Sequence, residues 1–321
     1  FFVYPGAEHT GKIFVVDIGI PADAPQYPLV KRSALEKSYG KALFPKRNRN
    51  THKNHYGHLL CIGGLSGKSG ALLLSGLSAL RTGAGLCTIA TDSATASNIE
   101  GRIPELMVEA AGGIEKDAFS FDPEKASRLI EGKSAIVIGM GLSRREGVIS
   151  FLEFVLSNCK VPVVVDADAI NLLSENREMM DAAKKTRAVF TPHPGELSRI
   201  YGISAGDVQS RRLFYAEKSA LDFGAVFVLK GANSIISAPD GRTSVNTTGN
   251  PGMASGGTGD SLSGIIGALL AMGNPLYESA CCSVLLHGIA GDLAAAEKGE
   301  YSMLATDLIA KIPEVIKEWQ A

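Results

Sequence analysis

A glycine-rich segment near residue 255 has the residue types and spacing best suited to chemistry on an anion. Apolar residues follow it at positions 262, 265, 266, 269 and 270, which is the spacing of one face of a helix. The glycines therefore stand at a helix N-terminus, where unpaired backbone N–H groups and the helix dipole favour a negative charge. Four residues are expected to form this anion hole: Gly256, Gly257, Thr258 and Gly259.

Asp260 ends the same segment. A carboxylate repels a phosphate, so its place beside an anion hole favours a general base that takes a proton from an attacking hydroxyl. The alternative is a helix residue whose charge complements the dipole. The flanking glycines and the length of the helix favour the general base, and both interpretations are kept at this point.

A second glycine loop, from Gly63 to Gly70, invites comparison with a phosphate-binding P-loop. The spacing does not fit, because a glycine would have to stand where Ile62 is. We interpret this segment as a strand-to-helix loop that touches a ligand near Gly70 and Ala71. A plain turn is the alternative.

Charged residues follow three further apolar runs. Lys230 begins Lys-Gly-Ala-Asn-Ser and could neutralise a phosphate, or be a solvated lysine. Asp166 and Asp168 could help to hold Mg²⁺ through water, or cap the next helix. In Thr-Pro-His-Pro-Gly-Glu, His193 could hydrogen-bond a substrate and Glu196 could begin the next helix. We expect no metal cage there, because no second ligand stands at a suitable spacing.

These polar segments need secondary structure that brings them together. Most of them follow short continuous apolar runs, which are typical of strands buried on both faces; the runs are residues 59–62, 135–138, 162–165, 188–190 and 226–229. Stretches with helical spacing lie between them, such as 71–82 and 146–156. The alternation predicts an α/β fold with a mostly parallel central sheet and helices on both faces. Ligands then bind beyond the carboxyl ends of the strands.

Composition excludes several classes of function. The 321 residues hold 32 Lys and Arg against 33 Asp and Glu, a balance that predicts no nucleic-acid partner and no anionic membrane. No continuous apolar run reaches the roughly 18 residues of a membrane span. The five cysteines form no Cys-x-x-Cys pair and predict a reducing, cytoplasmic compartment. His287 lies among leucines and is expected to be a packed helix residue.

The first residues differ in character from the rest. Residues 11–18 have the pattern of one strand without a helix of its own, so the strand must pair with something outside this region. Three prolines follow, at positions 21, 25 and 28, and indicate a linker. We therefore divide the chain into residues 1–29 and a main domain over residues 30–321. The start has neither Met nor a basic segment, so we expect a piece of a longer protein and no signal peptide.

Taken in order, the segments resemble the carbohydrate-kinase-like domain of NAD(P)H-hydrate dehydratases, which has a ribokinase-like fold. The resemblance covers about residues 35–318. It rests on residues 63–70, 79–86, 138–142, 165–171, 191–196, 229–232 and 248–260. Gly-Thr-Gly-Asp alone is typical of the wider ribokinase superfamily, whereas the combination of segments is specific to the dehydratases.

The resemblance implies a repair reaction. NADH and NADPH become useless when the nicotinamide C5=C6 bond is hydrated. The family phosphorylates the C6 hydroxyl of the S epimer of NADHX or NADPHX and then expels phosphate. In this chain Asp260 would take the hydroxyl proton while the amides of the anion hole stabilise the transferring phosphoryl group. Mg²⁺ would accompany the phosphates of the co-substrate, ADP or ATP.

The resemblance also assigns the two ligands to different residues. The hydrated dinucleotide would be held by Ala71, Gly141, His193 and Asp260. The ADP or ATP would contact Lys230, Gly231, Ala232, Asn233, Ser234 and Gly259. Family members commonly assemble into homo-oligomers. The sequence does not decide between ADP and ATP.

The first 21 residues resemble the last strand of an NAD(P)H-hydrate epimerase domain, which often precedes the dehydratase in a bifunctional protein. Tyr4-Pro5-Gly6 and residues 16–21 carry that match, so this chain is expected to lack epimerase activity. Two alternatives to a dehydratase are kept. A thiazole or pyrimidine kinase of the same superfamily would leave a phosphorylated product, and a silent nucleotide-binding sensor would have no use for Asp260.

Overall fold

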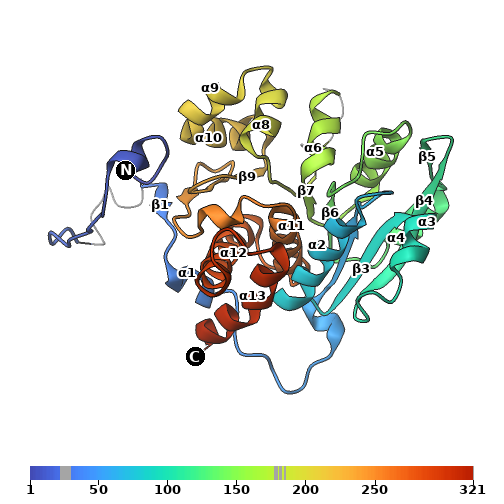
Figure 1. Cartoon of the computed structure of the whole chain (residues 1–321), viewed down its shortest axis with the longest axis horizontal. Coiled ribbons are helices and arrows are strands. Elements are labelled where there is room, and N and C mark those ends of the chain that lie inside the picture. The colour runs from blue at the N-terminus through green and yellow to red at the C-terminus, as the bar shows by residue number, and fades with distance from the viewer. Residues whose placement is uncertain (22–29, 177–179, 181–182, 184–185, 321) are drawn as a thin grey trace.

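One sheet of eleven strands forms the centre of the computed structural model, which describes residues 1–21, 30–176, 180, 183 and 186–320 (Figure 1). The strands are β1 Arg32–Ala34, β2 His58–Ile62, β3 Leu86–Asp92, β4 Met107–Glu115, β5 Ala118–Ser120, β6 Ala135–Ile138, β7 Val163–Val165, β8 Ala188–Phe190, β9 Val226–Leu229, β10 Ile235–Ser237 and β11 Thr243–Val245. Their order is β1-β11-β10-β9-β8-β7-β6-β2-β3-β4-β5. Neighbours from β9 to β4 run parallel, whereas β10 and β5 pair antiparallel.

Helices cover both faces of this sheet (Figure 1). They are α1 Lys37–Lys41, α2 Ser69–Thr82, α3 Ser93–Ile99, α4 Pro123–Ile130, α5 Val148–Asn158, α6 Ala167–Ser174, α8 Pro194–Tyr201, α9 Ala205–Ser210, α10 Arg212–Phe223, α11 Thr258–Ala271, α12 Leu276–Lys298 and α13 Ala305–Gln320. Strand side chains alternate between two cores. In β6, Val137 packs with α2, α11, α12 and α13, while Ile136 and Ile138 pack with α4, α5, α6, α8 and α10.

The predicted fold class is confirmed. The five apolar runs form β2, β6, β7, β8 and β9, and each strand is buried on both faces. The predicted helices at 71–82 and 146–156 correspond to α2 and α5, with ends shifted by up to two residues. Because the strands from β9 to β4 are parallel, the polar segments that follow them lie along one rim of the sheet.

Helix α12 is long and apolar enough to cross a membrane, and it alone passes that test among the described residues. However, 78% of its most apolar window is buried inside the molecule. Its buried side chains include His287, Leu285 and Leu286. The helix is therefore a core element packed between α13 and the sheet.

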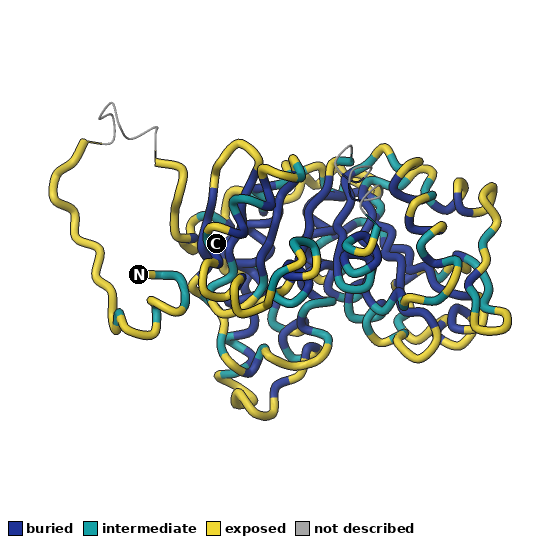
Figure 2. The backbone as a smooth tube through the Cα atoms, turned by 90° about the horizontal axis from the view of Figure 1, so that it is seen from above, coloured by how far each residue is buried: buried dark blue, intermediate teal, exposed yellow. Residues whose placement is uncertain are grey.

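The strand predicted over residues 11–18 is wrong. Residues 10–21 form no strand and run in an exposed arc that stands away from the body of the molecule (Figure 2). The side chains of Phe14, Val15 and Ile18 are largely exposed. Strand-like patterning produces a strand only where a neighbour accepts the backbone hydrogen bonds, and no described strand pairs with this segment. Phe2 and Val3 do pack against the second core. Of the predicted linker, residues 22–29 lie outside the described part of the chain.

Candidate active site

The glycine-rich segment forms a tight loop at the start of α11, as its pattern predicts. Gly257 is the N-cap residue, with φ of +92°, a left-handed conformation that favours glycine. A Cβ atom there would also lie 2.4 Å from Cδ1 of Leu74. Oγ1 of Thr258 donates to the carbonyls of Met253 and Ser255 at 2.8 and 2.9 Å. These contacts fix the amides of the predicted anion hole at the positive end of a buried helix.

His287 supports this loop from α12. Its Nε2 lies 2.9 Å from the carbonyl oxygen of Thr258 and 3.2 Å from Oγ of Ser261. A carbonyl only accepts hydrogen bonds, so Nε2 carries the proton. Burial lowers the pKa of His287 to about 4, and the ring is therefore neutral at physiological pH. The packed helix residue predicted from sequence thus also anchors the first turn of α11.

Two cavities open on either side of the glycine-rich loop. The first, of about 440 Å³, is lined by Tyr4, Lys230, Gly231, Ala232, Asn233, Ser234, Asn246, Thr248, Gly249, Asn250, Pro251, Met253, Ala254, Thr258, Gly259, Leu262, Val284, His287 and Gly288. The second, of about 500 Å³, is lined by Gly67, Lys68, Gly70, Ala71, Leu74, Gly141, Ala167, Asp168, Gly256, Gly257 and Asp260. Thr258 and Gly259 face the first cavity, and Asp260 faces the second. The loop thus separates two binding spaces.

The first cavity brings together all six residues assigned to the nucleotide, Lys230 to Ser234 and Gly259. Asn246, Thr248, Gly249 and Asn250 complete its wall, and sequence reasoning assigned no ligand contact to them. A signal existed, because Asn-Thr-Thr-Gly-Asn lies immediately before the glycine-rich segment. Asp292 of α12 holds this run through Gly249 N and Asn250 Nδ2, both at 3.0 Å.

The second cavity brings together Ala71, Gly141 and Asp260, three of the four residues assigned to the hydrated dinucleotide. The fourth, His193, does not line it. His193 is instead the N-cap residue of α8, where its Nδ1 accepts from the amides of Gly195 and Glu196 in a capping box. Glu196 lies in the first turn of the helix as expected, and its carboxylate accepts from His193 N at 2.8 Å.

Asp260 lies in the first turn of α11, and no hydrogen bond or ion pair to its carboxylate is found among the described residues. Burial, together with the negative charges of Asp166 and Asp168, raises the pKa of Asp260 to about 6, while Lys230 opposes the rise. A carboxylate with a pKa near neutrality is suited to accept a proton and release it again. The environment therefore fits a general base.

Lys230 is neither a solvated lysine nor a free phosphate ligand. Its Nζ lies 2.7 Å from Oδ1 of Asp166, and Oγ of Ser263 donates to Oδ2 of Asp166 at 2.6 Å. Burial disfavours both charges, but the ion pair outweighs burial, so the pKa of Asp166 is lowered and the pKa of Lys230 is raised. Asp166 precedes α6 without capping it through its side chain. The sequence carries no local signal for this pairing, because the two residues are 64 positions apart.

Lys68 forms a second ion pair at the rim. Its Nζ lies 3.0 Å from Oδ2 of Asp168, which also accepts from Ser143 N at 2.8 Å. Both charged residues line the second cavity. No group of three or more His, Cys, Asp or Glu side chains that could hold a metal ion occurs among the described residues. The two aspartates considered for Mg²⁺ are thus each engaged by a lysine.

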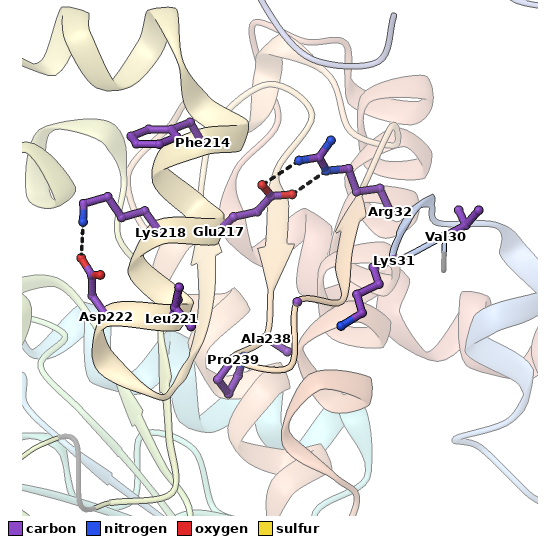
Figure 3. Close-up of a pocket in the computed structure, with 11 residues that line it drawn as sticks. Val30, Lys31, Arg32, Phe214, Glu217, Lys218, Leu221, Asp222, Ala238 and Pro239 are labelled. Carbon is purple, nitrogen blue, oxygen red and sulfur yellow. Dashed lines mark hydrogen bonds and ion pairs between the residues drawn. The ribbon is translucent and has the colours of Figure 1, made fainter. Parts of the chain in front are cut away.

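A larger hollow, of about 760 Å³, lies at the far edge of the sheet between β1 and α10 (Figure 3). Four of its charged residues form ion pairs, Arg32 with Glu217 at 2.6 Å and Lys218 with Asp222 at 2.8 Å, and Nζ of Lys31 donates to the carbonyl of Asp240 at 2.7 Å. None of the predicted site residues lines it. Most of the predicted site residues line the two cavities at the glycine-rich loop instead.

The sheet order, the glycine-rich loop at α11 and its paired cavities define a ribokinase-like α/β protein. A ribokinase-like superfamily protein from Enterococcus faecalis superposes with a TM-score of 0.77 at 28% identity, over 91% of this chain and 98% of that one. A family model described as NAD(P)H-hydrate dehydratase matches residues 59–314. The chain belongs to the NAD(P)H-hydrate dehydratase family.

Individual relatives agree with this assignment. A bifunctional NAD(P)H-hydrate repair enzyme from Moorella thermoacetica is 38% identical over 98% of this chain, which spans only 59% of that enzyme. An ADP-dependent (S)-NAD(P)H-hydrate dehydratase from Neisseria meningitidis is 35% identical over 80% of this chain and 83% of its own length. The structure of an ADP/ATP-dependent dehydratase from Bacillus subtilis, co-crystallized with ATP and Mg²⁺, has a TM-score of 0.74 at 30% identity, over 89% of this chain and 98% of that one.

Proposed function

We propose that the chain catalyses the ADP- or ATP-dependent dehydration of S-NADHX and S-NADPHX, which restores NADH and NADPH. One observation carries the proposal. The loop of α11 places Asp260 in one cavity and Gly259 in the other. A phosphoryl donor in the first cavity and a hydroxyl acceptor in the second would thus meet at the anion hole.

The reaction would run in two steps. Asp260 accepts the proton of the C6 hydroxyl, whose oxygen forms a bond to the terminal phosphorus of the nucleotide. The bond from that phosphorus to its bridging oxygen breaks, and its electrons leave with the shortened nucleotide. The ring nitrogen then donates its lone pair as the C6–O bond breaks and phosphate leaves. Loss of a proton from C5 restores the C5=C6 bond.

The nucleotide would be held by the turn from Lys230 to Ser234 and by Gly259, and the hydrated dinucleotide by Ala71, Gly141, Asp260 and His193. A contact from His193 would have to be made from the start of α8, because His193 does not line that cavity. Mg²⁺ would enter with the phosphates, which supply most of its ligands. Asp168 lines the substrate cavity and would hold the hydrated ion through water, where the ion neutralises phosphate charge.

Three further features belong to the same proposal. An epimerase domain precedes this domain in the full-length protein, in keeping with the greater length of the bifunctional relatives. The domain acts in the cytoplasm as a homo-oligomer. All five cysteines are free thiols, which fits a reducing compartment.

The test uses absorbance of the reduced nicotinamide. With S-NADHX, the signal is expected to rise only when both nucleotide and Mg²⁺ are present, and R-NADHX serves as the matched control that must stay silent. A rise without nucleotide, or none with either ADP or ATP, would contradict the proposal. Accumulation of a phosphorylated product would assign the chain to the small-molecule kinases instead.

A further inference from the structure

Arg212 is a buried cation beneath the nucleotide cavity. It is the first residue of α10, and only 2% of it is exposed. Nη1 donates to Oε1 of Gln209 at 2.9 Å, and Nη2 approaches the carbonyls of Leu229 and Asn233, each at 3.4 Å. Nε is buried without a hydrogen-bond partner. The guanidinium therefore spans the two ends of the turn that lines the cavity.

Arg212 differs from the other cations of the site in its electrostatic surroundings. No carboxylate forms an ion pair with it among the described residues, and burial alone lowers its pKa. The first turn of a helix is also the end at which the dipole disfavours a cation. The two lysines of the site differ in this respect, because Lys230 is paired with Asp166 and Lys68 with Asp168. A buried unpaired charge is costly, and its retention calls for a partner of opposite sign.

The turn above Arg212 is shaped around the guanidinium. Gly231 has a φ of +138°, and a Cβ atom there would lie 2.5 Å from Nη1 of Arg212. Glycine is thus required both for the backbone conformation and for the close approach. The same Gly231 lines the nucleotide cavity. A single residue, Gly231, therefore lies between the cavity and the guanidinium of Arg212.

We propose that Arg212 is a positioning residue of the nucleotide cavity, which holds the turn from Lys230 to Ser234 by its two ends and supplies the positive charge that an anionic nucleotide neutralises. The inference rests on the nucleotide dependence proposed above. The contribution of Arg212 to ligand affinity is expected to grow with the negative charge of the ligand, because the attraction of one unit charge increases with the charge of its partner. Adenosine gains nothing from the charge of Arg212, whereas ADP and ATP gain most.

The experiment titrates adenosine, AMP, ADP and ATP calorimetrically into the wild type and three variants. Arg212→Met removes the charge and keeps an aliphatic side chain, and it is expected to weaken ADP and ATP by about tenfold or more while adenosine stays within about twofold. Arg212→Lys keeps the charge and is expected to preserve the ratio of ATP to adenosine affinity within about threefold. Arg211→Gln removes an exposed charge one residue away and is expected to match the wild type.

Equal weakening of all four ligands in Arg212→Met, or no weakening at all, overturns the inference. If that variant has no cooperative unfolding transition, Arg212→Lys decides, and a fall in its ATP-to-adenosine ratio of about tenfold or more overturns the inference. A wild-type chain that binds none of the four ligands overturns the proposed function and the inference with it. Normal nucleotide binding by the wild type with unchanged Arg212→Met affinities overturns the inference alone.

Discussion

Nζ of Lys230 lies 2.7 Å from Oδ1 of Asp166, a carboxylate that is almost completely enclosed. Lys230 follows β9, and Asp166 follows β7. Ser263 of α11 donates to the second oxygen of the same carboxylate. One buried ion pair therefore links two strand ends to the helix that carries the proposed anion hole, and it joins the proposed nucleotide cavity to the centre of the sheet.

Removal of the cation should destabilise the fold. Lys230→Met leaves Asp166 buried without its partner, for which the expected loss is about 3–5 kcal/mol in the free energy of unfolding. Urea unfolding at pH 7 measures it. The double variant Asp166→Asn, Lys230→Met should recover most of this loss, since no charge remains buried. Lys68→Met is the matched control, because Lys68 is half exposed and its ion pair should contribute about 1 kcal/mol or less. Equal losses for Lys230→Met and Lys68→Met would contradict the assignment.

The neutral imidazole of His287 should matter for the rate more than for nucleotide affinity. His287→Leu deletes the donor to the carbonyl of Thr258 and loosens the first turn of α11. We expect a loss of about 1–2 kcal/mol in stability and a fall in kcat of about tenfold to hundredfold, because small displacements of oriented groups are costly. Steady-state kinetics with ADP and with ATP measure kcat and the KM for the nucleotide. His287→Asn, which keeps an N–H donor, is the control, and a His287→Leu variant with unchanged kcat would show that the anchor is dispensable.

Asp260 should make the stability of the protein depend on pH. Its pKa is raised from 3.8 to about 6 in the folded chain, so the folded state holds this proton more tightly than the unfolded state. The contribution of Asp260 to stability therefore falls as pH rises from about 4 to about 6, and the resulting penalty is constant above that range. Asparagine does not ionise, so the free energy of unfolding of Asp260→Asn should exceed that of the wild type by about 1–3 kcal/mol at pH 7.5. Unfolding measured at pH 4 and pH 7.5 tests this, and an equal difference at both values would contradict it.

The fold could be predicted because most of its central strands are continuous apolar runs that leave a local signal. Strands such as β11, which reads Thr-Ser-Val, and β4, which has many exposed residues, carry no such signal. They exist because a neighbouring strand pairs with them. The strand predicted around Val15 does not form, because no described strand pairs with this exposed segment despite its apolar pattern.

The candidate site was predictable as far as it is local. The glycine-rich segment was found from its spacing, and the turn after Lys230 was found from its place after an apolar run and from the family resemblance; each lines a cavity. Pairings across the chain were not visible, because Lys230 and Asp166 are 64 residues apart and meet only when β9 and β7 join the same sheet. Arg212 left no signal either, since a helical arginine is ordinarily exposed.

The general base is the most direct test of the mechanism. Asp260→Asn keeps the shape of the side chain and removes the proton acceptor. General-base catalysis contributes about 10²- to 10⁴-fold, so NADH formation should slow by that factor in single-turnover experiments.

The wild-type rate should rise with pH through an apparent pKa near 6, since only the ionised carboxylate of Asp260 accepts a proton. His193→Gln tests whether that limb belongs to the half-buried histidine instead, because His193 is also titratable and burial lowers its pKa from the ordinary value. Persistence of the limb in His193→Gln and its loss in the residual activity of Asp260→Asn assign it to Asp260. Nucleotide affinity of Asp260→Asn should hold steady or improve slightly, because a negative charge near the phosphates is gone. A rate within a few-fold of wild type, with nucleotide still bound, would leave Asp260 as a helix-dipole partner worth about 0.3–1 kcal/mol and remove it from the mechanism.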